Sequence, residues 1–318
     1  MKIGKTLKLE VFGESHAPRI GMRLEGFPAG MEIDLAALQA FMERRAPGRD
    51  GLSTPRREPD VPRFVAGVEN GVTTGAAIEA TIDNVDTRSS DYSRSVPRPG
   101  HADYPSWVKL GRIPAGGGSN SGRMTAPMCI AGALALQALG EYGVEVASEV
   151  VATGDIAAAK EEGDSVGGVI GCTIANLPAG LGGSMFDGID GALAQAMFGI
   201  PGVKGIEFGN GFAAAALKGS ENNDAFAVRC GKVVTLTNRH GGVLGGMTSG
   251  MPLVFRVAFK PTPSVFKPQR SVDLETMEEV ELEIKGRHDP CIALRARPAV
   301  EALAALVALD FILSGKNR

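Results

Sequence analysis

The chain has 318 residues, of which 44% are hydrophobic and 22% charged, and its formal net charge at pH 7 is −3. This length is sufficient for a sizeable hydrophobic core in one large domain or in two. The slight negative charge, with one Trp and three Tyr, argues against a nucleic-acid-binding protein, which usually carries a basic surface and stacking aromatic residues.

The spacing of the cysteines and the length of the apolar segments help to predict where in the cell the protein lies. Cys129, Cys172, Cys230 and Cys291 are scattered without a CxxC pair or a His at zinc spacing, which argues against a zinc site or a disulfide framework. The N-terminus has no apolar stretch of signal-peptide length, and the most apolar segment, residues 299–313, contains two acids and is too short to span a bilayer. We therefore expect a cytoplasmic protein without a membrane segment.

Four segments have the apolar spacing and the end signals of helices. In chain order they are residues 35–45 after the cap Asp34, residues 123–139 with Pro127 in the first turn, residues 188–197 after the cap Asp187, and residues 298–314 with Pro298 first. Strand-like runs occur at residues 7–12, 77–82, 166–174, 228–236 and 253–259. Two of the helices lack a polar face, so they need cover on several sides, which sheets flanking a helical layer would provide.

Several features recur in the same order in the two halves of the chain. GFPAGM at residues 26–31 resembles NLPAGL at residues 176–181, and GVENGVTTG at residues 67–75 resembles GVLGGMTSG at residues 242–250. Both halves then close with a Pro-containing apolar helix. Chance similarity among glycine-rich loops is the alternative, but the shared order favours a duplication. We therefore predict one pseudo-symmetric domain over residues 1–318, with a ligand cleft built from both halves.

All four histidines lie in Gly- or Pro-bearing segments that predict turns, and they are His16, His101, His240 and His288. A single histidine in a loop is usually only a surface residue, but four of four favours catalytic loops on a rigid scaffold. The sequence has no HExxH or HxH pattern for a metal and no GxSxG motif of a serine hydrolase. We therefore expect catalytic histidines and no metal.

Arginines cluster in two regions of this slightly acidic chain, around residues 44–57 and around residues 94–123. Arg binds phosphate and carboxylate well because its planar fork can donate two charge-assisted hydrogen bonds at once. For Arg44 and Arg45 alone, a solvated helix end is an equally good interpretation. The whole set favours a pocket for a polyanionic ligand.

Two loops could hold an anion through their backbone or side chains. GGGSNSGR at residues 116–123 leads into a predicted helix, and N–H groups at such a turn can cradle an anion, although tight-turn packing would explain it equally well. KPTPS at residues 260–264 follows a predicted strand and carries a cation and two hydroxyls. The glycine-rich loop matches neither the Walker pattern nor GxGxxG, and KPTPS alone is a weak signal.

Together these segments resemble the chorismate synthase family, in the family's order and over nearly the whole chain. The motifs that carry the resemblance are GESH (13–16), RR-x-PG (44–48), TPRREPD (54–60), RPGHADY (98–104), GDSVGG (163–168), PAGLG (178–182), IPGVKGIEFGNGF (200–212), KGSENND (218–224), KPTPS (260–264) and GRHDPC (286–291). No single motif is specific, but the series is.

The resemblance implies an α+β fold, a β-α-β sandwich with a helical layer between two antiparallel sheets, assembled as a homotetramer. It implies a lyase that eliminates phosphate from 5-enolpyruvylshikimate 3-phosphate in a 1,4-anti reaction to give chorismate. The reaction needs reduced FMN although it has no net redox change. The protein would stack cofactor against substrate, exclude water and hold fixed charges.

The resemblance also assigns roles to individual residues. His16 would donate a proton beside the departing phosphate, and His101 would protonate the reduced flavin. Asp289 would be the base that works through flavin N5, with hydrogen-bonding support from Ser15 and Ser121.

Binding positions follow from the same motifs. The flavin-binding residues would be Ser119, Asn120, Ser121, Pro201, Gly202, Gly245, Lys260, Pro261, Thr262, Pro263, Ser264 and Arg287. The substrate's phosphate and carboxylates would be bound by Arg45, Arg49 and Arg123, with Arg287 as a further candidate.

The sequence departs from the family pattern in the flavin loop. The family's GGGRSSxRET is GGGSNSGRMT here, so that Ser119, Asn120 and Met124 replace an Arg, a Ser and a Glu. The segment between residues 155 and 163 is also shorter than usual. Two alternative functions remain: a non-catalytic paralogue with an anion pocket, and a bifunctional enzyme that also reduces FMN with NADPH.

Overall fold

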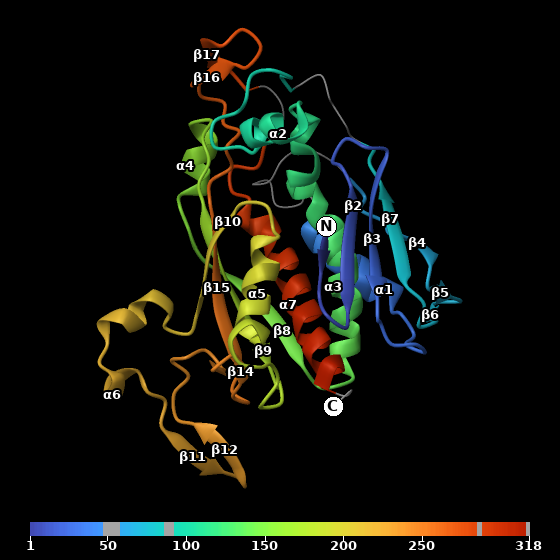
Figure 1. Ribbon diagram of the computed structural model, residues 1–318, viewed down its shortest axis with the longest axis vertical. Helices are drawn as coiled ribbons and strands as arrows, with labels where there is room; N and C mark the ends of the chain where they lie inside the picture. Colours follow the sequence, from blue (N-terminus) through green and yellow to red (C-terminus); the bar gives the residue numbers. More distant parts are fainter. Residues whose placement is uncertain (47–57, 86–91, 285–287, 316–318) are drawn as a thin grey trace.

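The computed structural model describes residues 1–46, 58–85, 92–284 and 288–315 (Figure 1). Its two larger sheets are entirely antiparallel and are combined with helices, so the protein belongs to the predicted α+β class. The first sheet has the strand order β1 (Lys2–Ile3), β2 (Lys8–Gly13), β3 (Arg19–Glu25), β7 (Ile78–Asp83), β4 (Arg63–Ala66). The second has the order β10 (Val203–Phe208), β15 (Leu253–Phe259), β9 (Gly168–Ala175), β8 (Glu145–Thr153).

Four small hairpins and seven α-helices complete the described fold. The hairpins are β5 (Val68–Glu69) with β6 (Val72–Thr73), β11 (Phe226–Arg229) with β12 (Lys232–Thr235), β13 (Val243–Leu244) with β14 (Met247–Thr248), and β16 (Gln269–Asp273) with β17 (Glu278–Leu282). The helices are α1 (Leu35–Arg45), α2 (Asp103–Leu110), α3 (Thr125–Gly140), α4 (Ile156–Glu161), α5 (Ile189–Phe198), α6 (Gly219–Asn222) and α7 (Ala293–Gly315).

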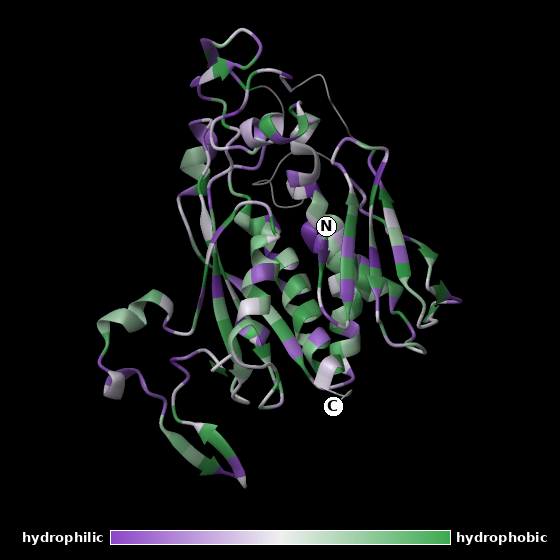
Figure 2. Ribbon diagram, in the orientation of Figure 1, coloured by the Kyte–Doolittle hydropathy of each residue, from purple (hydrophilic) through white to green (hydrophobic). Residues whose placement is uncertain are grey.

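The core is built around α3 and α7, which pack against each other. Helix α3 also packs on β2, β3 and β7 of the first sheet, whereas α7 packs on β8 and β9 of the second (Figure 1). Both helices are hydrophobic over most of their length (Figure 2), and 13 of the 16 residues of α3 and 16 of the 23 residues of α7 are buried. A helix that is apolar all round needs such cover, because any exposed side would leave apolar surface in water.

Several predicted elements are confirmed. Helix α1 has the predicted bounds, and the Asp34 side chain accepts a hydrogen bond from the Ala37 N–H at 2.8 Å, as an N-cap should. Strand β15 also has the predicted bounds, with every second residue buried. Helix α3 begins two residues later than predicted, because residues 122–124 form a 3-10 turn.

Three boundary predictions are wrong. The predicted strand at residues 228–236 is a hairpin, because Cys230 and Gly231 both have positive φ and turn the chain back. The cap of α5 is Gly188, since Asp187 belongs to a preceding 3-10 turn. Pro298 lies inside α7, which begins five residues earlier than predicted.

Helix α7 is long and apolar enough to cross a membrane by length and composition, the one such helix in the described residues. It has 23 residues, so the expectation that this segment is too short was wrong. However, 78% of its most apolar stretch is buried inside the protein. We therefore describe it as the central helix of the core.

The two halves of the chain repeat one local hydrogen-bond pattern. The Thr73 hydroxyl accepts from the Met31 N–H at 3.0 Å and donates to the Pro28 carbonyl at 2.7 Å. The Thr248 hydroxyl accepts from the Leu181 N–H at 2.9 Å and donates to the Pro178 carbonyl at 2.6 Å. Each Thr ends a small hairpin, β5–β6 or β13–β14. These are the two segments whose sequences resemble each other.

Asp310 in α7 fastens the start of the chain to the core. Its carboxylate accepts hydrogen bonds from the N–H groups of Lys5, Thr6 and Leu7 at 2.7–2.9 Å. We expect Asp310→Ala to lower the free energy of unfolding by about 3 kcal/mol, because these part-buried donors lose a charged acceptor. Urea unfolding would measure the change. Glu161→Ala on the exposed face of α4 is the control, and equal stability of the two variants would contradict the prediction.

Candidate active site

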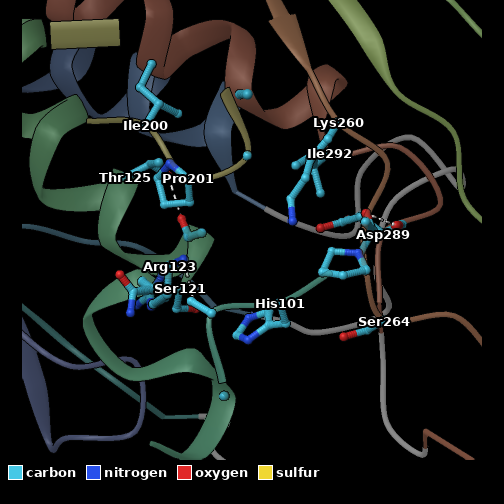
Figure 3. Close-up of a pocket in the computed structure, with 18 of the residues that line it drawn as sticks. His101, Ser121, Arg123, Thr125, Ile200, Pro201, Lys260, Ser264, Asp289 and Ile292 are labelled. Atoms are coloured by element: carbon cyan, nitrogen blue, oxygen red, sulfur yellow. Dashed lines mark hydrogen bonds between the residues drawn. The ribbon is translucent and has the colours of Figure 1, made fainter. Parts of the chain in front are cut away.

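A cavity of about 590 Å³ opens where segments from both halves of the chain converge. This volume is within the range of small-molecule sites. It is lined by the ends of α1 and α7, the loops before α2 and α3, the segment between α5 and β10, and the loop after β15. Figure 3 shows side chains from these segments arranged around one open space.

Three successive glycines, of which Gly116 lines the cavity, lie beside the two predicted catalytic histidines. Gly116, Gly117 and Gly118 all have positive φ, which side-chain-bearing residues rarely adopt. A Cβ atom on Gly116 would lie 2.1 Å from Cε1 of His16, and one on Gly117 would lie 3.1 Å from Cε1 of His101. The glycine loop therefore gives both imidazoles room to lie against the backbone.

His101 is held by a buried carboxylate. Its Nδ1 lies 2.6 Å from Oδ1 of Asp103, and the Arg98 guanidinium lies 3.1 Å from the same nitrogen and 2.7 Å from Oδ2 of Asp103. Burial alone would raise the pKa of the Asp103 carboxyl, but hydrogen bonds from His101 and Arg98 outweigh burial and hold that pKa well below its usual range. Asp103 therefore stays ionised and fixes the orientation of the ring.

His16 has a different neighbour. Its Nδ1 lies 3.1 Å from the hydroxyl of Ser15, a residue with no exposed surface. The Ser15 hydroxyl can also donate to the carbonyl of Gly116 at 3.3 Å, and the ring of Tyr92 lies edge-on to the imidazole with centroids 5.4 Å apart. Ser15 thus links His16 to the glycine loop.

Two arginines of the cavity share one buried carboxylate. Arg45 donates to Oδ2 of Asp60 at 2.6 Å, and Arg123 donates to Oδ1 of the same group. Burial would raise the pKa of Asp60, but the two cations outweigh it and lower that pKa. Nη2 of Arg123 is buried and has no hydrogen-bond acceptor among the described residues, and Oε2 of Glu58 is 3.7 Å away. A buried donor without an acceptor fits a site that binds an anionic ligand.

Asp289 lies on another wall of the cavity and pairs with Arg295. The Arg295 guanidinium donates to Oδ2 of Asp289 at 2.7 Å, and the Thr262 hydroxyl donates to the Asp289 backbone carbonyl at 2.7 Å. Figure 3 shows Asp289, Lys260 and Ser264 around the same open space as His101.

Two lysines add to the positive charge of the lining. Burial and the nearby ammonium of Lys204 lower the pKa of Lys260, which donates to the Gly100 carbonyl. The described lining contains six basic side chains and two acidic ones: Arg45, Arg98, Arg123, Lys204, Lys260 and Arg295 against Glu58 and Asp289. Such an excess favours a ligand with several negative charges.

Most residues predicted for catalysis and binding line this cavity. They are His16, His101, Asp289 and Ser121, then Ser119, Asn120, Pro201, Gly202, Lys260, Thr262, Pro263 and Ser264, and finally Arg45 and Arg123. Ser15 contacts His16 from behind, and Pro261 belongs to a lining loop without facing the cavity. Gly245 does not line it and lies in the turn between β13 and β14. Arg49 and Arg287 lie outside the described residues.

Several charged residues of the site were assigned no role from the sequence: Glu58, Arg98, Lys204 and Arg295 in the lining, and Asp60 and Asp103, which pair with lining Arg and His side chains. Asp60 is the last residue of the motif TPRREPD and Asp103 the last but one of RPGHADY, so their position beside Arg and His was a usable signal. Arg295 had no such signal, because its pairing with Asp289 depends on where α7 begins. Among the described residues, no three His, Cys, Asp or Glu side chains gather as metal ligands would.

A family profile, several relatives and a solved structure each match nearly the full length of this chain. The chorismate synthase family profile matches residues 7–157 and 152–313. The chorismate synthase of Thermococcus gammatolerans is 45% identical over 98% of this chain and 98% of its own length, and that of Archaeoglobus fulgidus is 44% identical over 98% and 96%. A crystal structure of chorismate synthase matches with a TM-score of 0.75 at 26% identity, covering 98% of this chain and 93% of that one.

Proposed function

Because the chain belongs to the chorismate synthase family, we propose that the cavity described above is the active site for this family's reaction. The chain is accordingly an enzyme, a carbon–oxygen lyase of aromatic biosynthesis. The substrate is 5-enolpyruvylshikimate 3-phosphate, and the products are chorismate and phosphate. One observation carries the assignment of the site: His16, His101 and Asp289, which are far apart in sequence, line one cationic cavity.

The charges of the cavity suit this substrate, which carries a phosphate and two carboxylates. Nη2 of Arg123 offers a buried hydrogen-bond donor to an incoming oxygen, and Lys204 and Lys260 add two further cations. Because Arg45 and Arg123 already share Asp60, they are held rigidly and lose little conformational freedom on binding. The site therefore binds the anionic groups with preorganised donors.

The chemistry of the lining also fits reduced FMN, which would supply an electron that helps to expel phosphate and is recovered as the ring hydrogen leaves. Ile200, Pro201 and Ile292 provide apolar contact surface for a flat ring (Figure 3). The loops at residues 119–121 and 262–264 provide hydroxyls and backbone N–H groups. Gly245 is left out of this set, because it lies away from the cavity.

The side chains of this chain then handle protons and charge. His16, which the Ser15 hydroxyl holds in place, protonates the departing phosphate. His101, whose ring is fixed by Asp103, would hold the proton that the reduced cofactor needs. Asp289, paired with Arg295, would be the base that takes up the proton of the substrate ring by way of flavin N5.

We also propose a layered fold, a single domain, a cellular location and an oligomeric state for this chain. The fold is a sandwich with α3, α5 and α7 between the two sheets, and its matching hairpins at Thr73 and Thr248 support an internal duplication. One continuous core joins both halves, which supports a single domain over residues 1–318. The enzyme is cytoplasmic and assembles as a homotetramer, as the family resemblance implies.

Anaerobic turnover tests the function directly. The protein, mixed with substrate and chemically reduced FMN, should form chorismate and release an equal amount of phosphate. His101→Ala should lower turnover by roughly 10- to 1,000-fold, because a positioned proton donor is lost. Lys109→Ala, which changes an exposed residue near the end of α2, serves as the control with unchanged turnover.

Absence of turnover above the flavin-only reaction would rule out the function, and full activity of His101→Ala would rule out its role. The same mixture separates the two alternatives. Substrate binding without turnover would indicate a non-catalytic paralogue. NADPH oxidation in the presence of free FMN would indicate a bifunctional enzyme.

A further inference from the structure

Asn84 connects two segments of the active site without facing the cavity itself. It directly follows the last residue of β7, it is partly buried, and it is not among the residues that line the cavity. Its side chain contacts the loop that carries His16 on one side and the guanidinium of Arg123 on the other. None of the sequence motifs includes Asn84, and the proposed reaction gives it no part.

The position of Asn84 follows from the pairing of strands in the first sheet. Strand β7 runs antiparallel beside β3, with Asp83 opposite Arg19 (Figure 1). The residue after Asp83 therefore comes opposite the residue before Arg19, and the Asn84 N–H donates to the Pro18 carbonyl at 2.9 Å. Pro18 ends the loop that joins β2 to β3, which we call the His16 loop (residues 14–18). The sheet thus holds the backbone of Asn84 beside this loop.

The side-chain amide of Asn84 binds both ends of a turn in the His16 loop. The Ala17 N–H donates to the Glu14 carbonyl at 3.0 Å, which closes the turn around His16. Nδ2 of Asn84 donates to the Ala17 carbonyl at 2.7 Å and to the Glu14 carbonyl at 3.3 Å. The amide therefore fixes the segment of backbone from which the imidazole projects.

The oxygen of the same amide fixes Arg123. Oδ1 of Asn84 accepts a hydrogen bond from Nε of Arg123 at 2.9 Å, and Asp60 accepts one from Nη1. A guanidinium is planar and rigid, so two fixed nitrogens determine where the third one points. The third nitrogen, Nη2, is the buried donor that has no acceptor among the described residues. Asn84 and Asp60 together therefore aim this donor.

The chemistry of the partners requires an amide at this position. The two loop carbonyls can only accept hydrogen bonds and the guanidinium can only donate them, so one orientation of the Asn84 amide satisfies all of them. A carboxylate of the same shape would have no donor for the loop. A Gln side chain would be longer by one methylene and would not fit the same distances. The contacts are therefore specific to Asn84.

We propose that Asn84 is a positioning residue for the departing phosphate of the substrate, because it sets the His16 loop and Nη2 of Arg123 relative to each other. The inference rests on the proposed function, in which His16 protonates that phosphate and Arg123 donates to an anionic group of the substrate. A proton donor and an anion-binding donor must reach the same small group at once. A displacement of about 1 Å at such a site can cost about 100-fold in rate.

Calorimetry without flavin tests the contact with Arg123. Asn84→Ala should weaken binding of 5-enolpyruvylshikimate 3-phosphate by about three- to tenfold, because a charge-assisted hydrogen bond would lose its direction. In the Arg123→Ala chain, the same substitution should change binding by less than about twofold, since the donor that it aims is absent. An equal loss in both chains would show that Asn84 does not act through Arg123 and would overturn the inference.

Nuclear magnetic resonance of the histidine rings, also without flavin, tests the contact with the His16 loop. The chain has four histidines, so the signals of His16 can be identified from their loss in His16→Gln. Asn84→Ala should shift these signals and leave those of His240, which does not line the cavity, unchanged. Turnover with reduced FMN should fall by about 10- to 100-fold. Unchanged His16 signals would overturn the inference.

Asn176→Ala is the matched control. It removes a similar bond, in which Nδ2 of Asn176 donates to the Gly143 carbonyl at 3.0 Å, but on the exposed surface and away from the cavity. The His16 signals, substrate binding and turnover should all stay as in wild type. Equal effects of Asn176→Ala and Asn84→Ala would show a general loss of stability and would overturn the positioning role.

Asn84→Asp keeps the test decisive if Asn84→Ala does not fold. This variant has nearly the same shape and keeps an acceptor for Arg123, but it has no donor for the His16 loop. The His16 signals should shift and turnover should fall as for Asn84→Ala, and wild-type values of both would overturn the inference. A wild-type chain that neither binds nor converts the substrate contradicts the proposed function. A wild-type chain that does both, with Asn84 variants that match it, contradicts only the role of Asn84.

Discussion

Replacing Gly116 with Ala is expected to lower turnover by about 100-fold or more, because even a shift of about 1 Å in a catalytic group can cost that much. The added Cβ would lie 2.1 Å from Cε1 and 2.4 Å from Nδ1 of His16, and 3.0 Å from the Ser15 hydroxyl. His16 would have to leave its position over the loop. Gly116 also has a φ of 60°, so Ala there would cost about 1–2 kcal/mol of stability.

Gly191→Ala, in α5 and away from the cavity lining, is the control. A Cβ at Gly191 would meet no atom within 4 Å, so turnover should stay within about threefold of wild type. Both variants would be compared in the anaerobic assay, with circular dichroism to verify folding. If Gly116→Ala kept wild-type turnover, His16 would not need its present position, and its role as proton donor would be wrong.

Replacing Gly132 with Ala is expected to destabilise the fold by about 3 kcal/mol, near the upper end for an overpacked core. Gly132 lies where α3 crosses α7, and its added Cβ would lie 2.1 Å from Cβ and 2.3 Å from Cα of Ala302. Ala302 has no exposed surface and cannot rotate away. The two helices would have to separate, which would loosen packing on both sheets.

Gly140→Ala, at the end of the same helix, should instead increase the stability of the fold. No atom would lie within 4 Å of its Cβ, and Ala in place of Gly adds about 0.5–1 kcal/mol of helix stability. Urea unfolding of both variants would give the comparison. Equal stability of the two would show that the α3–α7 crossing tolerates a wider spacing than the structure has.

Local signals in the sequence were sufficient to predict those helices and strands whose caps and apolar periodicity lie within the element itself. The cap Asp34 and the apolar face of α1 predicted that helix, and alternation of large apolar residues predicted β15. The motif series identified the family, and most of the residues that it predicted for the site line the cavity, including His16, His101 and Asp289. These signals succeed because caps, periodicity and motifs depend on neighbours in sequence.

Contacts between distant segments were decided only by the tertiary structure. Asp289 pairs with Arg295 because α7 begins before Pro298. Gly245 lies outside the cavity, contrary to the prediction, because it is in the turn of the hairpin β13–β14. The Gly116 loop could be predicted as an anion cradle, but its fit beneath His16 required two segments a hundred residues apart to meet. The sequence by itself thus determined the family, the chemistry-bearing residues and the isolated elements. Which of those residues touch was left to packing, because a contact distance between remote segments depends on every element that lies between them.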